Sequence, residues 1–270
     1  MQHMKKVVLI TGGSSGIGKA IGIYLLTKDY EVFGTSRNPD QVTDASFPLL
    51  AMDVRAIDSI QQTIQTIVEK TGRLDVVINN AGVGITGPIE EIPTFEIKNN
   101  FDINLFGPIE VMKAALPIMR KQNSGLIINI TSIAGYMGLP YRGIYSSSKG
   151  ALELITEALR MEVKSFGVHI ANVAPGDFAT NIAAGRYHAP VVAGSAYELP
   201  YGSTLNEMNT HVDAGNDPNE MARAIHKIIE TKHPKIHYKV GAFMQKFSIV
   251  LKRILPDTVY EKMLMNHYKL

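Results

Sequence analysis

The sequence predicts an α/β fold in which about seven strands form one doubly wound parallel sheet with helices on both faces. Short apolar runs alternate with longer segments of helical periodicity, which is the pattern of repeated strand–helix–strand units. A glycine-rich turn follows the first apolar run directly, and polar residues follow several later ones. Parallel strands end at one edge of a sheet, so we expect these residues to share a site there.

The expected strands are short and apolar, and each is followed by a turn or a helix. They lie at residues 5–11, 31–36, 49–52, 74–78, 126–130, 168–174 and 236–240. Helical segments are expected at residues 17–28, 56–70, 145–166 and, as one or two helices, within 93–119. Since a strand, a glycine-rich loop and a helix open the chain, we expect a Rossmann-type sheet built to bind a dinucleotide.

Composition and charge fit one globular domain over residues 1–270 and exclude several classes of function. The chain is 45% hydrophobic and 19% charged, with a net charge of +2 and no basic run, so a nucleic-acid partner is not expected. The absence of cysteine excludes thiol catalysis and disulfides. No histidines stand at metal-ligand spacing, so we expect no metal. Without a signal-peptide pattern or an apolar run that could span a bilayer, we expect a cytoplasmic protein.

The glycine-rich turn reads TGGSSGIG from Thr11 onward. Gly12 permits a sharp exit from the strand, Gly16 lets a diphosphate approach backbone N–H groups, and Gly18 allows the helix to pack closely on the strand. A plain glycine-rich turn is the alternative. The position directly after the first strand favours diphosphate binding.

The end of the second strand carries Ser36 and Arg37, where a protein that binds a free ribose hydroxyl usually has an acidic residue. A guanidinium and a hydroxyl suit a 2′-phosphate better than a carboxylate does. The sequence therefore favours NADP(H), with an exposed loop arginine as the alternative.

Polar residues also follow the third, fourth and fifth strands. Asp53 follows the third, Asn79 and Asn80 the fourth, and Ser132 the fifth. We expect a structural role for Asn79, whereas Asn80 fits either a strand-bridging or a ligand-binding role. Asn104 lies inside a predicted helix, where asparagine is unfavourable unless it is exposed or has a purpose.

Tyr145 and Lys149 are four residues apart on one helix face. A cation beside a phenol favours the phenolate, so this tyrosine is suited to pass a proton to or from a substrate oxygen. The pair alone also fits two surface side chains, and only the preceding motifs decide between them. The same helix carries apolar residues on two faces, which predicts packing on more than one side.

Together these motifs resemble the short-chain dehydrogenase/reductase family of the single-domain type. The residues that carry the resemblance run from 5 to about 180: TGGSSGIG, Asp53-Val54, NNAG, Asn104, Ser132, YxxxK and Pro175-Gly176, in order and at the family's spacing. Residues 181–270 are only weakly constrained by it.

The resemblance implies an oxidoreductase that interconverts a ketone and a secondary alcohol. Tyr145 would act as the general acid/base, and Lys149 would stabilise its phenolate and hold the nicotinamide ribose. Ser132 would donate a hydrogen bond to the substrate oxygen, and Asn104 would position a water. A homodimer or homotetramer is implied as well. The implied cofactor-binding residues are Gly12, Ser14, Ser15, Gly16, Ile17, Gly18, Ser36, Arg37, Asp53, Val54, Asn80, Ala81, Gly82, Tyr145, Lys149, Pro175, Gly176 and Thr180.

The last third of the chain bears on the substrate. We expect a substrate lid over residues 181–215 and an amphipathic helical tail over residues 241–270. In the tail, apolar residues at helical spacing interleave with lysine and arginine, which fits a helix packed over the pocket, on a partner subunit or on a membrane surface. The apolar surface favours a lipophilic substrate, a steroid-like or long-chain 3-oxo lipid ketone. A 3-oxoacyl-thioester reductase and a catalytically silent NADPH sensor are the alternatives.

Overall fold

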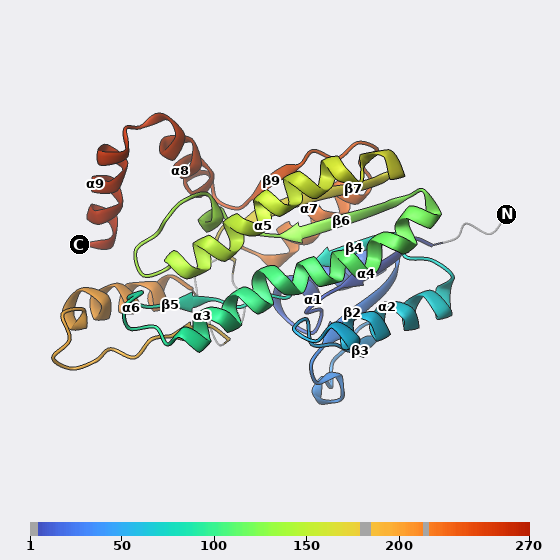
Figure 1. The fold of residues 1–270 in the computed structure, drawn as a ribbon, viewed down its shortest axis with the longest axis horizontal. Helices are drawn as coiled ribbons and strands as arrows, with labels where there is room; N and C mark the ends of the chain where they lie inside the picture. Colours follow the sequence, from blue (N-terminus) through green and yellow to red (C-terminus); the bar gives the residue numbers. More distant parts are fainter. Residues whose placement is uncertain (1–4, 179–184, 213–215) are drawn as a thin grey trace.

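The computed structural model describes residues 5–178, 185–212 and 216–270. Its main sheet has seven strands, all parallel, in the order β3-β2-β1-β4-β6-β7-β9 (Figure 1). This confirms the predicted α/β doubly wound sheet of about seven strands. The strands are β1 (Val7–Ile10), β2 (Glu31–Ser36), β3 (Leu49–Ala51), β4 (Val76–Asn79), β6 (Gly125–Ile130), β7 (Val168–Pro175) and β9 (His237–Val240).

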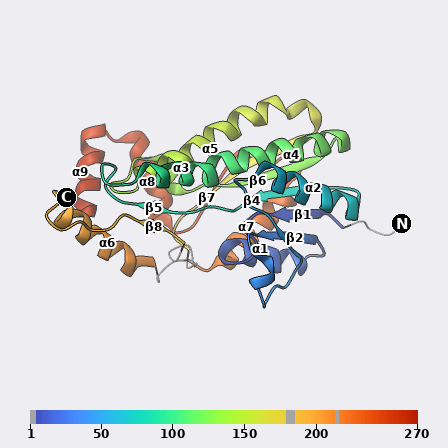
Figure 2. The same cartoon turned by 60° about the horizontal axis from the view of Figure 1, so that its bottom comes forward.

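Helices cover both faces of this sheet (Figure 2). One face packs against α1 (Gly16–Leu26) and α7 (Pro218–Ile229), and the other against α2 (Ile57–Thr71), α4 (Gly107–Gln122) and α5 (Gly143–Glu162). The chain runs outward from β1 to β3 and then returns to place β4 on the other side of β1. This reversal opens a crevice beyond the carboxyl ends of β1 and β4.

The period-two alternation of strand residues divides the core into two layers. In β1, Val7 and Leu9 pack with the helices of one face, whereas Val8 and Ile10 pack with those of the other. All four are 0–1% exposed. Burying side chains of this size contributes about 1.5–3 kcal/mol each, so both layers stabilise the strand whose end forms the glycine-rich turn.

The predicted helical region at 93–119 is one long helical stretch with a distortion in the middle. Here α3 (Thr94–Phe101) continues through a π-helical turn (Asp102–Phe106) into α4. The π turn carries Asn104, the residue whose position inside a helix required an explanation. Wide turns of this kind are frequent at functional sites.

Helix α5 differs in detail from the expected segment at 145–166. It begins at Gly143 and ends at Glu162, and a 3-10 turn (Lys164–Phe166) follows it. Its predicted two-sided packing is only half present in the single chain, because Leu154 is 67% exposed while Leu152 is fully buried. Two further 3-10 turns lie at Pro39–Gln41 and Ile133–Tyr136.

A second, two-stranded sheet was not expected. It pairs β5 (Ile85–Thr86) with β8 (Tyr187–His188) in parallel. Strands of two residues leave too little pattern to be recognised in a sequence. Their pairing brings the start of the expected lid region against the chain that follows β4.

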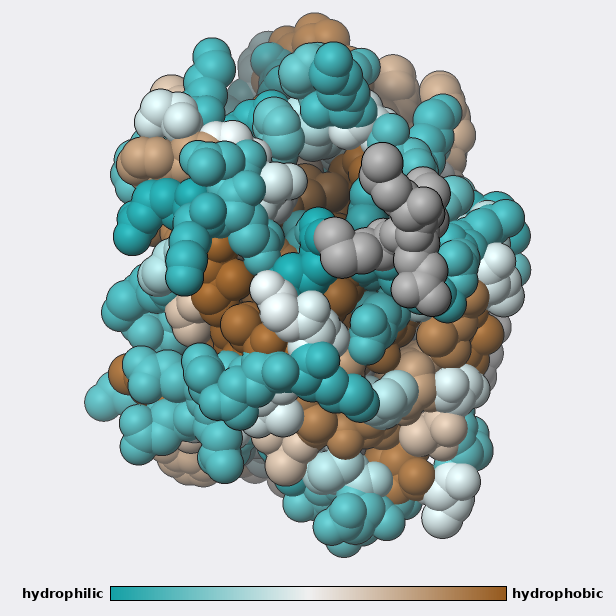
Figure 3. Space-filling view, turned by 90° about the vertical axis from the view of Figure 1, so that its right-hand side faces the viewer, coloured by the Kyte–Doolittle hydropathy of each residue, from teal (hydrophilic) through white to brown (hydrophobic). Residues whose placement is uncertain are grey.

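The remaining helices lie at one end of the molecule. They are α6 (Glu198–Val212), within the expected lid region, and the tail helices α8 (Phe243–Ile254) and α9 (Asp257–Tyr268). The tail lies at the end opposite the N-terminus (Figure 1). Viewed from the N-terminal side, the surface is a mosaic of hydrophilic residues with smaller hydrophobic patches between them (Figure 3). In the described ranges, no helix combines the length and the hydropathy that a bilayer-spanning segment needs.

Candidate active site

The glycine-rich turn has the geometry that its sequence predicts. Gly12 and Gly16 adopt positive φ angles of 65° and 53°. A Cβ atom on Gly18 would lie 2.3 Å from the carbonyl oxygen of Gly12 and 2.5 Å from Nδ2 of Asn80. Gly18 therefore lets α1 pack directly beneath the turn, where any side chain would collide with backbone.

Two side chains tie this turn to the end of β4. Asn80 Nδ2 donates hydrogen bonds of 3.0 Å to the carbonyl oxygens of Thr11 and Gly12. Thr11 Oγ1 accepts from the backbone N–H groups of Asn80, at 3.0 Å, and Ala81, at 2.9 Å. Asn80 thus bridges two strand ends, and Asn79 has the structural role expected of it, since its Nδ2 donates to Asn129 Oδ1 at 2.8 Å.

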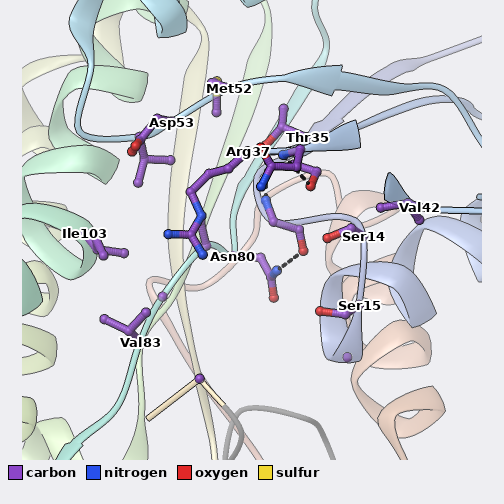
Figure 4. Close-up of a pocket in the computed structure, with 18 of the residues that line it drawn as sticks. Ser14, Ser15, Thr35, Arg37, Val42, Met52, Asp53, Asn80, Val83 and Ile103 are labelled. Carbon is purple, nitrogen blue, oxygen red and sulfur yellow. Dashed lines mark hydrogen bonds between the residues drawn. The ribbon is translucent and has the colours of Figure 1, made fainter. Parts of the chain in front are cut away.

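A cavity of about 530 Å³ extends from the glycine-rich turn along the carboxyl ends of β1, β2 and β4 (Figure 4). Most of the predicted cofactor residues line it: Gly12, Ser14, Ser15, Gly16, Ile17, Ser36, Arg37, Asp53, Val54, Asn80, Ala81 and Gly82. Of the others, Tyr145, Lys149, Pro175 and Gly176 lie outside its lining and Gly18 lies under the turn, whereas Thr180 falls outside the described residues. The sequence reasoning missed Thr35, Asn38, Gln41, Val42, Met52, Arg55, Val83, Ile103 and Gly185, which also line the cavity.

Arg37 supplies a cation to this cavity. Its guanidinium group points into the space between Asp53 and Asn80 (Figure 4). Asp53 is paired with Arg55 at 2.6 Å, and the hydrogen bond from Arg55 lowers the pKa of that carboxyl, with a smaller contribution from Arg37. Within the described ranges Arg37 forms no ion pair within 4 Å, so its charge is free to meet an anion.

Asn104 and Lys149 come together with Gly82 at the inner end of the site. Asn104 Oδ1 accepts from the N–H of Val83 and its Nδ2 donates to the Val83 carbonyl, both at 2.9 Å. A Cβ atom on Gly82 would lie 3.1 Å from Asn104 Oδ1 and 3.3 Å from Lys149 Nζ. Lys149 is 5% exposed, and burial lowers its pKa from 10.5 to about 8.

Ser132 and Tyr145 lie on two segments whose backbones are in close contact, the turn after β6 and the start of α5. Ser132 follows β6 and begins a 3-10 turn, where its Oγ accepts from the N–H of Ala134 at 3.2 Å. A Cβ atom on Gly150 would lie 2.8 Å from the carbonyl oxygen of Gly135. This contact holds the Ser132 turn against the first turns of α5, which carry Tyr145. Across the described part of the chain, the Tyr145 hydroxyl has no hydrogen-bond partner.

Gln245 of α8 covers the end of β7. A Cβ atom on Gly176 would lie 2.0 Å from Gln245 Oε1, and Gln245 Nε2 donates to Asp177 Oδ2 at 2.6 Å. The tail therefore packs on the segment that contains Pro175 and Gly176. The family pattern gave no sign of this contact, because it joins residues far apart in the sequence.

A buried carboxylate behind Ser132 was also missed. Glu153 of α5 is 5% exposed, and it accepts hydrogen bonds from Thr131 Oγ1 at 2.5 Å and Tyr136 OH at 2.7 Å. Its Oε2 is 2.9 Å from His237 Nδ1. Burial, with the charge of Glu153, raises the pKa of Tyr136. The network joins α5 to the end of β6, to the 3-10 turn that follows Ser132 and to the start of β9.

These geometries place a buried lysine at the inner end of the cavity, with a tyrosine on the same helix and a serine beyond the end of β6. Comparison with known proteins identifies the class of the protein. The family model for short chain dehydrogenases matches residues 6–190. The chain belongs to the short-chain dehydrogenase/reductase family of oxidoreductases.

Individual relatives extend the likeness to nearly the whole chain. A 3-ketodihydrosphingosine reductase of Bacteroides thetaiotaomicron is 37% identical over 264 residues, covering 97% of this chain and 98% of its own. An NADPH-dependent 3-dehydrocapnine reductase of Ornithobacterium rhinotracheale is 30% identical, covering 98% of both chains. The crystal structure of a short-chain dehydrogenase from Streptomyces avermitilis superposes with a TM-score of 0.81 at 28% identity, covering 98% of this chain and 96% of its own. Solved structures of the same fold hold NADP in some cases and NAD in others.

Proposed function

We propose that this protein is an NADP(H)-dependent oxidoreductase that reduces the ketone of a lipophilic molecule to a secondary alcohol, or catalyses the reverse reaction. The observation that carries the proposal is the meeting of Lys149, Asn104 and Gly82 at the inner end of the cavity. Tyr145 stands one helical turn before Lys149 on the same helix. Proton-transfer groups thus adjoin a space suited to a dinucleotide.

The residues present fit a nicotinamide dinucleotide. Positive φ at Gly12 and Gly16 and the absence of a side chain at Gly18 leave backbone N–H groups at the start of α1 open to a diphosphate. Ser36 and Arg37 suit the additional phosphate of NADP(H), because among the described residues no carboxylate lies within ion-pair distance of Arg37 and Asp53 is paired with Arg55. The name of the Ornithobacterium relative, which specifies NADPH, supports the same choice. When bound, the nicotinamide supplies or accepts the hydride.

The protein groups would handle the proton and orient the carbonyl. Tyr145 OH donates its proton to the substrate oxygen. Ser132 Oγ already accepts a hydrogen bond from Ala134, so its own O–H is free to donate to the same oxygen. Lys149, held by a 2.9 Å hydrogen bond to the Ile130 carbonyl, stabilises the phenolate that remains on Tyr145.

Asn104 would act on this site through the backbone. Its carboxamide is hydrogen-bonded to both the N–H and the carbonyl of Val83. It thereby fixes Gly82 against Lys149 Nζ, which makes it a positioning residue. A water between Asn104 and Lys149, as the family resemblance implies, stays part of the proposal.

A lipophilic substrate is supported by the surroundings of Tyr145. Its ring packs at the edge of a cluster formed by Ile85, Ile92, Ala189 and Tyr201. The names of the Bacteroides and Ornithobacterium relatives also point to 3-keto compounds. We propose a long-chain 3-oxo lipid ahead of a steroid-like ketone, with a 3-oxoacyl thioester as the alternative. A silent NADPH sensor is disfavoured because Tyr145 and Lys149 are both present.

Exposed apolar surfaces support our proposals for the oligomeric state and the cellular location. Leu154 and Ile155 of α5 are 67% and 39% exposed, which suits a homodimer or homotetramer interface. Phe243 and Ile254 of α8 are each 73% exposed beside Lys252 and Arg253 of the same helix, which suits contact of a cytoplasmic protein with a membrane surface. The region around α6 would act as the substrate lid.

The experiment that tests the function is NADPH consumption, with NADH in parallel, against long-chain 3-oxo lipids, steroid ketones, 3-oxoacyl thioesters and small soluble ketones. Turnover of long-chain ketones with NADPH is expected. Turnover of small polar ketones alone, or with NADH alone, would overturn the substrate or the cofactor assignment. Binding of NADPH without any turnover would favour the sensor.

A further inference from the structure

Two arginines outside the lining of the cofactor cavity act on Tyr145: Arg142 lies against its ring, and Arg186 interacts with it electrostatically. Arg142 immediately precedes α5, and its guanidinium carbon lies 5.4 Å from the centroid of the Tyr145 ring. Arg186 immediately precedes β8 and lies on Gly84, where a Cβ atom would be 2.8 Å from Arg186 Cγ and 2.9 Å from its Nε. Both arginines are half-buried. A side chain at position 84 would therefore force Arg186 to shift.

The two guanidinium groups are close enough to act on each other. Burial lowers the pKa of Arg186, and the positive charge of Arg142 lowers it further, whereas Tyr145 and Asp177 act in the opposite direction. Two like charges withdrawn from water oppose folding unless an anion compensates them. An anion that binds beside the two arginines would relieve this repulsion.

The described residues supply such an anion only in part, because the carboxylate of Asp177 acts on Arg186 from beyond ion-pair distance. In those ranges neither arginine makes an ion pair within 4 Å. The carboxylate of Asp177 accepts a 2.6 Å hydrogen bond from Gln245 Nε2. Arg142 hydrogen-bonds to the phenol of Tyr268 in α9, a neutral group. Among the residues that the structure describes, no carboxylate therefore lies within ion-pair distance of the positive charge beside Tyr145.

The backbone holds both arginines in place. Tyr141, next to Arg142, has a φ of 58°, a left-handed conformation that costs a residue other than glycine about 1–3 kcal/mol. Its carbonyl accepts from the N–H of Gly87 at 2.8 Å. Arg186 is fixed by the pairing of β8 with β5, where Tyr187 N–H donates to the Gly84 carbonyl at 3.1 Å. Strained or special geometry that persists next to a reactive group points to a use in the site.

We propose that Arg142 and Arg186 bind an anionic group of the substrate, a carboxylate, sulfonate or phosphate, that lies within a few bonds of the ketone on which Tyr145 acts. This inference rests on the proposed function and narrows its substrate to an acidic keto lipid. Guanidinium groups bind such anions through paired, charge-assisted hydrogen bonds. The apolar remainder of the molecule would pack toward Ile85, Ile92 and Tyr201. An ammonium group in the same place would be repelled.

The test compares ketones that differ only in the charge of the head group. The NADPH-loaded protein is given 3-oxohexadecanoate, its methyl ester, and a long-chain 2-amino-3-ketone. We expect kcat/KM to be at least about tenfold higher for the acid than for the ester, and lowest for the amine, as charge-assisted hydrogen bonds of this strength imply. Equal values for acid and ester, or a preference for the amine, would overturn the proposal.

Variants assign the preference to the two arginines. Arg142→Gln and Arg186→Gln should each reduce the ratio of kcat/KM for acid over ester toward one. Arg142→Lys should keep part of the ratio because it retains the charge. Arg223→Gln, which removes an exposed arginine on α7, is the matched control and should keep the full ratio. If the glutamine variants leave the ratio unchanged, the arginines are not the anion site.

A binding measurement tests the anion site independently of the proposed catalytic function. Calorimetry on the NADP-loaded protein with 3-hydroxyhexadecanoate and with its methyl ester needs no turnover. Tighter binding of the acid, lost in the Arg142→Gln, Arg186→Gln double variant while NADP affinity is kept, supports the anion site even if none of the ketones is reduced. Equal binding of both compounds by the wild-type protein would overturn it.

Discussion

Lys149 Nζ donates a 2.9 Å hydrogen bond to the carbonyl oxygen of Ile130, the last residue of β6. This bond joins the helix that carries Tyr145 to the strand end that precedes Ser132. The relative position of Tyr145 and Ser132 is therefore set by a helix and a strand end that are hydrogen-bonded to each other. Elements of the sheet and its covering helix hold them, which favours a fixed geometry.

The burial of Lys149 gives a pH-dependent prediction. Its pKa is lowered from 10.5 to about 8, so between these pH values the unfolded chain holds a proton that the folded chain has lost. Stability contributed by this group therefore rises with pH across that window, by at most about 1.4 kcal/mol for each pH unit. Lys149→Met removes this dependence, and it should also abolish turnover.

Urea unfolding of the wild-type protein and Lys149→Met between pH 7 and 10.5 measures the effect. The stability of the variant relative to the wild-type protein should be greatest near pH 7 and decline as the pH rises. Other titrating groups are common to both proteins and cancel in the difference. A difference that does not change with pH would contradict the assigned burial of the charge.

Tyr145→Phe should separate chemistry from binding. Removing the hydroxyl removes the proposed proton donor, and general acid catalysis of this kind contributes about a hundredfold to ten-thousandfold in rate. The ring would still pack beside Arg142, so NADPH affinity should stay within about threefold of the wild-type value, far less than the effect of a lost charged hydrogen bond. Single-turnover kinetics and a fluorescence titration with NADPH measure the two quantities. Turnover that survives the substitution would remove Tyr145 from the chemistry.

Arg37→Ala should change the cofactor preference. The variant loses a cation with no competing ion pair among the described residues, and charged hydrogen bonds of this type contribute about 1.5–3 kcal/mol. We expect kcat/KM for NADPH to fall about tenfold to a hundredfold, while the value for NADH changes little. Arg120→Ala, on the far end of α4, is a control that should alter neither. Equal losses for both cofactors would mean that Arg37 does not bind the 2′-phosphate that distinguishes NADPH from NADH.

Gly18→Ala should damage the turn beneath the cavity. The added methyl group would lie 2.3 Å from the Gly12 carbonyl oxygen, and overpacking against rigid backbone typically destabilises a fold by about 1–3 kcal/mol. NADPH affinity should fall as the turn shifts. Gly138→Ala is the matched control, since a Cβ atom there has no atom within 4 Å. Thermal unfolding with and without NADPH compares them, and equal behaviour of the two variants would refute the packing role.

The reach of sequence reasoning differs from one part of this site to another. The conformation of Gly12 and the close packing at Gly18 could be predicted because both belong to a local pattern whose spacing has a mechanical reason. Tyr145 was singled out by its spacing from Lys149, and its role stays a prediction. Asn104 was singled out by its unfavourable place in a helix, but the π turn that holds it could not be foreseen from side-chain periodicity. Glu153 gave no signal, because its partners come from two stretches of the chain, residues 131–136 and His237, that are distant from each other in sequence.

Arg186 likewise could not be assigned to the site from the sequence. It comes near enough to interact electrostatically with Tyr145 because two strands of two residues each, β5 and β8, pair across about a hundred residues of sequence. Periodicity cannot reveal such short strands. The contact of Gln245 with Gly176 is likewise a product of tertiary packing, in a part of the chain that family motifs do not constrain.

The exposed face of α8 predicts membrane binding. Phe243, Met244 and Ile254 are 73%, 67% and 73% exposed, and Lys252 and Arg253 lie on the same helix. Such a helix places its apolar residues among the headgroups while its cations meet anionic lipid. The wild-type protein should sediment with vesicles of phosphatidylcholine and phosphatidylglycerol, and less so as salt rises or when phosphatidylglycerol is left out. Replacing Phe243, Met244 and Ile254 by serine should release it. Phe95→Ser, at a 67% exposed site on α3, is the matched control and should still bind. Binding that the triple variant retains, or that the control loses equally, would assign the tail to a different contact, such as a partner subunit.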